Sequence, residues 1–164
     1  MKFKALFLTL LIALVPALAS AHEYSHGKVR IDHPWSRPTP PGTPMGVGYL
    51  AIVNNSMKDI TLTAAETPRA GHVSIHESLM KDGVMRMQAL KDGLKIPAGD
   101  MVELKPHGYH LMLEQLKEPL KAGERIPLNL YFDGVETMKV ELLVEPLDKD
   151  MSAQPMNHSG HGME

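Results

Sequence analysis

The chain has 164 residues, a formal net charge of −2 and no cysteine, and its 12 Met and 9 His outnumber its 1 Trp, 4 Tyr and 3 Phe. Without cysteine it has no disulfide and cannot form a blue-copper electron-transfer centre, which needs a thiolate beside two imidazoles. No basic cluster could follow a phosphate backbone, so we expect no nucleic-acid partner. The bias toward Met and His is the first indication of function.

The amino terminus is predicted to be an export signal covering residues 1–21. Lys2 and Lys4 precede the apolar run 5–15, and small residues follow as far as Ala19 and Ala21. The run is too short to cross a bilayer, so we expect a periplasmic protein with no membrane insertion once the signal is removed. Cleavage after Ala19 and cleavage after Ala21 both satisfy the small-x-small pattern.

Removal of residues 1–21 takes away Lys2 and Lys4, so the 17 basic residues become 15 against 19 acidic ones. The remaining chain is long enough for one domain, which we expect at 22–147. Beyond it, residues 148–164 are predicted to be a flexible tail, biased toward metal ligands by Met156, His158, His161 and Met163.

Short β-prone runs alternate with turn signals through the whole domain, and none of them resembles a long helix. Turns spaced by about 8 to 12 residues are typical of an all-β sandwich or barrel. The expected strands are 28–32, 47–54, 60–63, 73–79, 84–88, 101–105, 110–114, 126–132 and 138–144.

The dipeptide Asp82-Gly83 predicts a two-residue β-hairpin that pairs Ser78 with Met87 and His76 with Ala89. Side chains alternate along a strand and paired residues point to one face, so His76 and Met87 become diagonal neighbours. A ring and a flexible thioether at such positions could bind one metal ion together.

A second strand offers the same donors. In the run 110–114, alternation places His110 and Met112 on one face and Leu111 and Leu113 on the other, where we expect the core. If this strand lies beside the hairpin, imidazole and thioether donors converge on one point. Cu(I) favours these donors, whereas calcium and magnesium prefer oxygen and structural zinc prefers thiolates.

From 29 to 144 the sequence resembles the periplasmic copper chaperones of the PCu(A)C family. The segments that carry the resemblance are 31–42, 49–55, 73–77, 82–87, 96–99 and 104–113. The family's copper motif falls here on His76, Met87, His110 and Met112, with 22 residues between Met87 and His110, about one more than the usual form. His107 stands where the family's turn has a second glycine.

The resemblance implies a cupredoxin-like (Greek-key) β-sandwich that is not an enzyme and that binds Cu(I) at these four residues. Delivery would be to the apo form of cytochrome c oxidase subunit II or to another copper-assembly protein, by a chaperone that we expect to be a monomer. For the tail, Met156, His158, His161 and Met163 fit the Cu(II)-binding extension of some family members.

Other functions remain open at this point. A periplasmic copper sequestration or resistance protein would use the same donors. A copper monooxygenase with a histidine brace would need His22 as the first residue, which only cleavage after Ala21 provides.

Metal binding by His22 and His26 stays open, and His107 could perturb its turn or add a ligand. We interpret His33 and His72 as loop residues and Trp35 as a core anchor, while Met80 and Met85 share the proposed metal face without being required by the motif. Four methionines are expected to fill the core, namely Met45, Met57, Met101 and Met138.

Overall fold

The computed structural model describes residues 23–147, and this part of the chain consists of strands and loops without an α-helix. The strands are β1 (Glu23–His26), β2 (Val29–Ser36), β3 (Met45–Asn54), β4 (Ile60–Glu66), β5 (His72–Lys81), β6 (Val84–Ala89), β7 (Leu94–Ile96), β8 (Met101–Leu104), β9 (Tyr109–Glu114), β10 (Arg125–Asp133) and β11 (Val135–Val144). The all-β prediction is therefore confirmed. Among the described residues, no helix has the length and apolarity that crossing a membrane would require.

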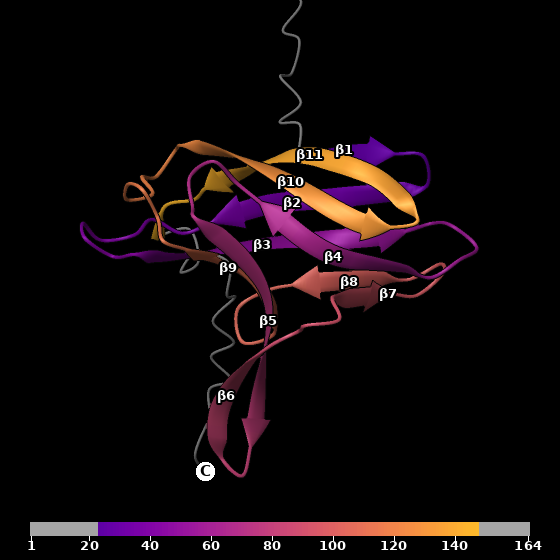
Figure 1. The fold of residues 1–164 in the computed structure, drawn as a ribbon, viewed down its shortest axis with the longest axis horizontal. Coiled ribbons are helices and arrows are strands. Elements are labelled where there is room, and N and C mark those ends of the chain that lie inside the picture. Colours follow the sequence, from indigo (N-terminus) through magenta and orange to yellow (C-terminus); the bar gives the residue numbers. More distant parts are fainter. Residues whose placement is uncertain (1–22, 148–164) are drawn as a thin grey trace, which may run out of the picture.

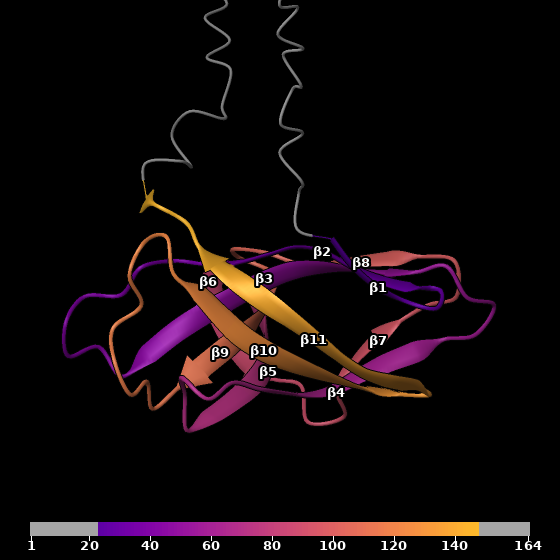
Figure 2. The same cartoon turned by 90° about the horizontal axis from the view of Figure 1, so that it is seen from above.

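The strands form one 11-stranded sheet that curls on itself (Figures 1 and 2). Its order is β6-β5-β9-β8-β3-β2-β11-β10-β4-β7, with β1 paired to β2 and a further pairing between β9 and β3. Most neighbours are antiparallel, whereas β11 runs parallel to β2 and β8 parallel to β9. Strands that are distant in this order, such as β4 and β5, also contact each other, so the curled sheet encloses the core.

Alternation along the strands supplies that core. On β10, for example, Ile126, Leu128 and Leu130 are buried while the residues between them are not. Leu111 and Leu113 of β9 are fully buried at 0% exposure, as the alternation in the sequence predicts. The opposite face of β9 is thereby left for other chemistry.

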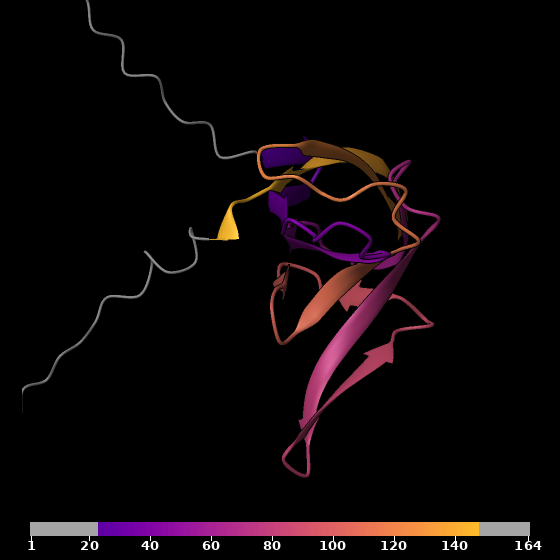
Figure 3. The ribbon, with the colours of Figure 1, turned by 90° about the vertical axis from the view of Figure 1, so that its left-hand side faces the viewer.

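The hairpin formed by β5 and β6 extends beyond the rest of the fold (Figures 1 and 3). β6 is an edge strand of the sheet, and all of its residues are exposed. Asp82 and Gly83 connect the two strands with φ angles of 54° and 75°, as a type I′ turn requires. The predicted turn and its register are thus confirmed, since Ser78 lies opposite Met87 and His76 opposite Ala89.

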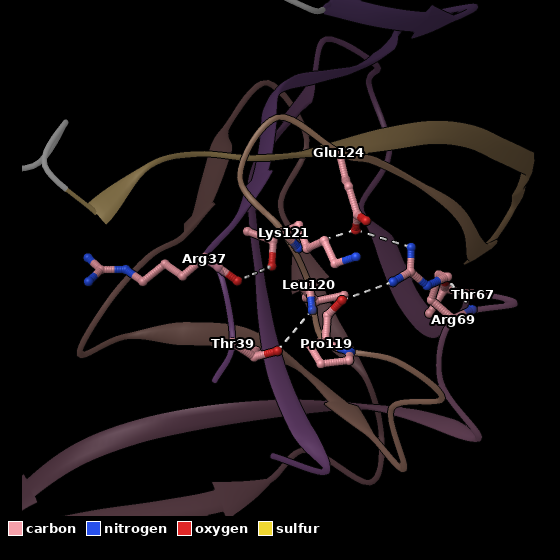
Figure 4. A network of polar contacts seen from close by, with 9 residues as sticks. Arg37, Thr39, Thr67, Arg69, Pro119, Leu120, Lys121 and Glu124 are labelled. Atoms are coloured by element: carbon pink, nitrogen blue, oxygen red, sulfur yellow. Dashed lines mark hydrogen bonds and ion pairs between the residues drawn. The ribbon is translucent and has the colours of Figure 1, made fainter. Parts of the chain in front are cut away.

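The loop between β9 and β10 is held by contacts to two other parts of the chain (Figure 4). The backbone of Leu120 exchanges two hydrogen bonds with Thr39, of 3.0 and 2.9 Å. The Arg69 guanidinium donates to Glu124 Oε2 and to the Pro119 carbonyl, each at 3.2 Å. These contacts fix the chain as it leaves β9, and with it the end of the strand that carries His110 and Met112.

Several sequence predictions about single elements are wrong. β1 and β7 were not expected as strands, because β1 is mostly polar and exposed and β7 has three residues. His33 is not in a loop but in β2, where it has a φ of 46° at an irregularity in the pairing with β3. His72 is likewise not a loop residue, since it begins β5.

The prediction of core methionines is correct for one position of four. Met138 is 4% exposed, whereas Met45, Met57 and Met101 are 46%, 91% and 54% exposed. The sequence pattern failed there because all three lie at a strand end or in a connection, outside the regular alternation. Trp35 is only half-buried, stacked at 4.6 Å between ring centroids on Tyr49, and is not a core anchor.

Candidate metal site

The four residues of the predicted motif lie on three consecutive strands of the sheet and share one face. β5 is the middle strand, paired with β6 on one side and β9 on the other. In this register His76 lies opposite His110, and Met112 lies opposite Ser74. Met87 lies opposite Ser78, one diagonal step from His76. The strand with His110 and Met112 therefore does lie beside the hairpin, as the convergence of the four donors requires, because β9 pairs directly with β5.

The two imidazoles face each other across the β5–β9 ladder. Their ring centroids are 5.7 Å apart and their planes are inclined by 43°. Metal–imidazole bonds are about 2 Å long, so one ion placed between the rings could reach a nitrogen of each. The pairing of β5 with β9 sets this separation.

A hydrogen-bond chain determines which nitrogen of His76 is free. Ser74 Oγ lies 2.5 Å from Glu114 Oε1 and 2.9 Å from His76 Nε2. The hydroxyl has a single proton, which it donates to the carboxylate, and its oxygen then accepts from the protonated Nε2. His76 Nδ1 is left unprotonated, and it is buried without a hydrogen-bond partner.

On the His110 ring the free nitrogen is Nε2, whereas on His76 it is Nδ1. His110 Nδ1 lies 3.0 Å from the carbonyl oxygen of Gly108, which can only accept, so Nδ1 carries the proton. Its Nε2 is therefore an unprotonated lone pair, again buried without a hydrogen-bond partner. Buried polar atoms are nearly always hydrogen-bonded, so two such lone pairs on adjacent rings need an explanation. A metal ion between the rings provides one.

Electrostatics keep the His76 ring neutral. Burial lowers the pKa of His76 below its usual value of 6.5, and the electrostatic effect of the neighbouring His110 lowers this pKa further. The Glu114 carboxylate acts in the opposite direction but does not prevail. A neutral imidazole is the form that binds metal, so this environment favours a ligand over a proton.

The two thioethers differ in accessibility. Met112 is 9% exposed and lies between Ser74 of β5 and Val47 of β3 in the sheet, whereas Met87 is 54% exposed on the projecting hairpin. Three of the four donors therefore belong to the well-packed part of the sheet. The fourth comes from a strand that solvent surrounds.

The remaining predicted site residues, Met156, His158, His161 and Met163, lie outside the described residues, as does His22. No group of three or more His, Asp or Glu side chains suited to a metal occurs between residues 23 and 147. Sequence reasoning missed Ser74 and Glu114. The available signal was strand alternation: Ser74 is two residues before His76 and Glu114 is two residues after Met112, so each lies on the same face as that ligand.

Comparison with known proteins places the chain in a family. Residues 29–144 match the sequence model of the family described as "Putative lipoprotein LpqE-like". This chain belongs to the LpqE-like family. Another relative, "Putative lipoprotein Lxx21020" of Leifsonia xyli subsp. xyli, is 31% identical to this LpqE-like chain over 146 residues, which cover 89% of this chain and 84% of that protein.

Solved structures extend the relationship of this LpqE-like protein to PCuAC domains. The copper-bound PCuAC domain of PmoF2 superposes with a TM-score of 0.65 at 23% identity, covering 76% of this chain and 98% of that domain. The Cu(I) form of DR1885 from Deinococcus radiodurans gives 0.53 at 28% identity, covering 79% and 83%. The predicted cupredoxin-like β fold is thereby confirmed, and the predicted resemblance to PCu(A)C domains is confirmed in the fold.

Proposed function

We propose that this protein is a periplasmic copper chaperone, without enzymatic activity, that binds Cu(I) through His76, Met87, His110 and Met112. One observation carries the proposal. His76 Nδ1 and His110 Nε2 are buried lone pairs without hydrogen-bond partners, on rings whose centroids are 5.7 Å apart. Each is left free because the other nitrogen of its ring is engaged by the protein.

The donor set selects the metal. Two neutral imidazoles and two neutral thioethers suit a soft monovalent ion, whereas calcium and magnesium would need oxygen ligands. Thioethers neither titrate nor form disulfides, so such a site works in an oxidising compartment. Two structural relatives contain copper, namely the copper-bound PCuAC domain of PmoF2 and the Cu(I) form of DR1885.

The difference in accessibility suggests how copper leaves. Met87 is the donor on the exposed hairpin, so it is the ligand that an acceptor's own donor atom replaces first. The two histidines and Met112 retain the ion until the new bond has formed. Transfer then proceeds by stepwise exchange of ligands, and copper is never released into solution.

The destination and the chain organisation complete the proposal. Residues 1–21 act as an export signal, 22–147 form the copper domain, and 148–164 form a tail whose Met156, His158, His161 and Met163 bind Cu(II). The exported protein acts as a monomer and delivers copper toward cytochrome c oxidase subunit II or another copper-assembly protein. Names of relatives as lipoproteins agree with export.

Titration with Cu(I) against a competing chelator tests the site. Replacing His76, His110 or Met112 by Ala lowers the affinity by about tenfold or more each, because outer-shell changes alone reach that size. Met57→Ala is the matched control, since Met57 is 91% exposed and lies in the connection between β3 and β4. Wild-type affinity in all three site variants would refute the proposal.

A transfer assay distinguishes a chaperone from a sequestration protein. The Cu(I)-loaded protein is mixed with apo cytochrome c oxidase subunit II, and copper in each is measured after separation. A chaperone loses copper to the subunit, and a scavenger retains it. Mass spectrometry of the exported protein addresses the monooxygenase alternative, because an amino terminus other than His22 removes the histidine brace.

A further inference from the structure

A second group of thioethers lies on the outer half of the β5–β6 hairpin. Met80 and Met85 are directly opposite each other in the ladder, and Met87 follows Met85 by two residues on the same strand. The three side chains are therefore on one face. They are 65%, 46% and 54% exposed, so none of them contributes to the core.

The two faces of the hairpin differ in chemistry. The face that carries the methionines continues inward through Ser78 to His76, and it holds no charged side chain between residues 76 and 89. The opposite face carries the charged and amide side chains, with Glu77 and Gln88 hydrogen-bonded at 3.2 Å, together with the exposed Leu79 and Val84. Solvent reaches both faces, so burial does not explain why all three thioethers of the hairpin lie on one of them.

The geometry suits a small soft cation. Opposite residues in an antiparallel ladder have Cβ atoms about 4.5 to 5.5 Å apart, and the three rotatable bonds of methionine let two sulfurs converge from there. Met87 is about 7 Å along the strand from Met85, within reach of the same point. A hard cation would find no oxygen ligand from a carboxylate on this face.

We infer that Met80, Met85 and Met87 form an outer Cu(I) site composed only of thioethers, separate from the proposed histidine site and adjacent to it. Met87 lies between the two and can serve either. The outer site binds more weakly, because it lacks imidazole donors. It receives the ion at the exposed end of the hairpin, and the inner site then takes it up.

NMR of the full exported chain with methyl-labelled methionine tests this inference residue by residue. Ag(I), a stable mimic of Cu(I), is titrated first, and Cu(I) is then added without oxygen. The methyl signal of Met112 moves with the first equivalent, and those of Met80 and Met85 move together at higher metal concentration. Signals that stay unmoved for Met80 and Met85 at saturation overturn the inference.

Substitutions separate the outer site from the proposed function. In M80L the metal-dependent shift of Met85 is lost, and in M85L that of Met80 is lost, while Met112 responds as in the wild type. The double variant M57L/M101L, which removes two exposed thioethers elsewhere, keeps all these shifts. If each methionine still responds when its partner is leucine, the two do not form one site and the inference fails.

A variant without the two site histidines tests whether the outer site exists independently of the proposed histidine site. In H76A/H110A the proposed inner site is lost, and the shifts of Met80 and Met85 persist. If the Met112 signal of the wild type does not shift on metal addition while those of Met80 and Met85 do, the proposed function alone is contradicted. A Met112 response without one at Met80 and Met85 would contradict the outer site alone.

Discussion

Glu114 controls His76 without contacting it. The carboxylate lies 2.5 Å from Ser74 Oγ, and Ser74 lies 2.9 Å from His76 Nε2, so a residue on β9 determines the tautomer of a ring on β5. The same strand carries His110, whose ring is oriented separately by the Gly108 carbonyl. The protein thus fixes both free nitrogens with groups that do not themselves bind metal.

Ser74→Ala is expected to lower Cu(I) affinity by about 10- to 100-fold, the usual effect of losing an outer-shell partner of a metal-binding histidine. Without the hydroxyl, the ring can protonate on Nδ1 and present the wrong nitrogen. Competition titration gives the affinity, and nitrogen NMR of the imidazole gives the tautomer. Ser78→Ala, on the same face of β5, is the control. Equal affinities for the two variants would contradict the assigned hydrogen-bond chain.

Met112 and Met87 are expected to differ in their effect on folding. Met112→Ala empties a site that is 9% exposed and lowers the free energy of unfolding by about 2 to 4 kcal/mol. Met87→Ala changes the free energy of unfolding by less than about 0.5 kcal/mol, because its side chain is exposed. Denaturant unfolding of the metal-free proteins measures both. Met112→Leu keeps the volume, so it separates loss of the ligand from loss of packing.

His107→Gly is expected to stabilise the fold by about 0.5 to 1 kcal/mol. His107 has a φ of 63°, where an L-residue pays about 1 to 2 kcal/mol, partly offset by the greater chain entropy of glycine. Its side chain is exposed and belongs to no described contact with the site. Chemical denaturation tests the stability, and Cu(I) titration should give the wild-type affinity. A loss of affinity would make His107 a ligand.

The lowered pKa of His76 predicts resistance of the metal site to acid. The ring remains neutral as pH falls past 6.5, so Cu(I) binding weakens at lower pH than an ordinary histidine would allow. In the unfolded chain the ring takes up its proton near 6.5, so the metal-free fold loses stability as pH drops from there toward the folded pKa. Proton NMR titration of His76 checks the direction. In H76A this part of the pH dependence of unfolding should disappear.

The sequence was sufficient where the local pattern determines geometry. Asp82-Gly83 fixed a turn type and therefore a register, and the alternation in 110–114 separated ligands from core leucines. It was insufficient where the outcome depended on tertiary contacts. Hydrophobic periodicity does not encode where strand ends and loops lie in the fold. It therefore could not show that three methionines at such positions are exposed, namely Met45, Met57 and Met101.

The pairing of β5 with β9 was an assumption that no residue pattern could establish, because residues 82–108 and three other strands separate the two. Ser74 and Glu114 were missed for the same reason. Their roles exist only once His72 lies opposite Glu114 and Ser74 opposite Met112. Local propensity specifies strands, whereas the polar chain around a ligand follows from how the strands are joined.

The projection of β6 from the body also affects how the protein can change. A strand with every residue in solvent tolerates substitution with little penalty to folding, so donors such as Met87 can be exchanged for other ligand types while the packed interior stays as it is. Metal preference can therefore be altered at the hairpin by single replacements, and this strand is the natural starting point for redesigning the protein toward another ion.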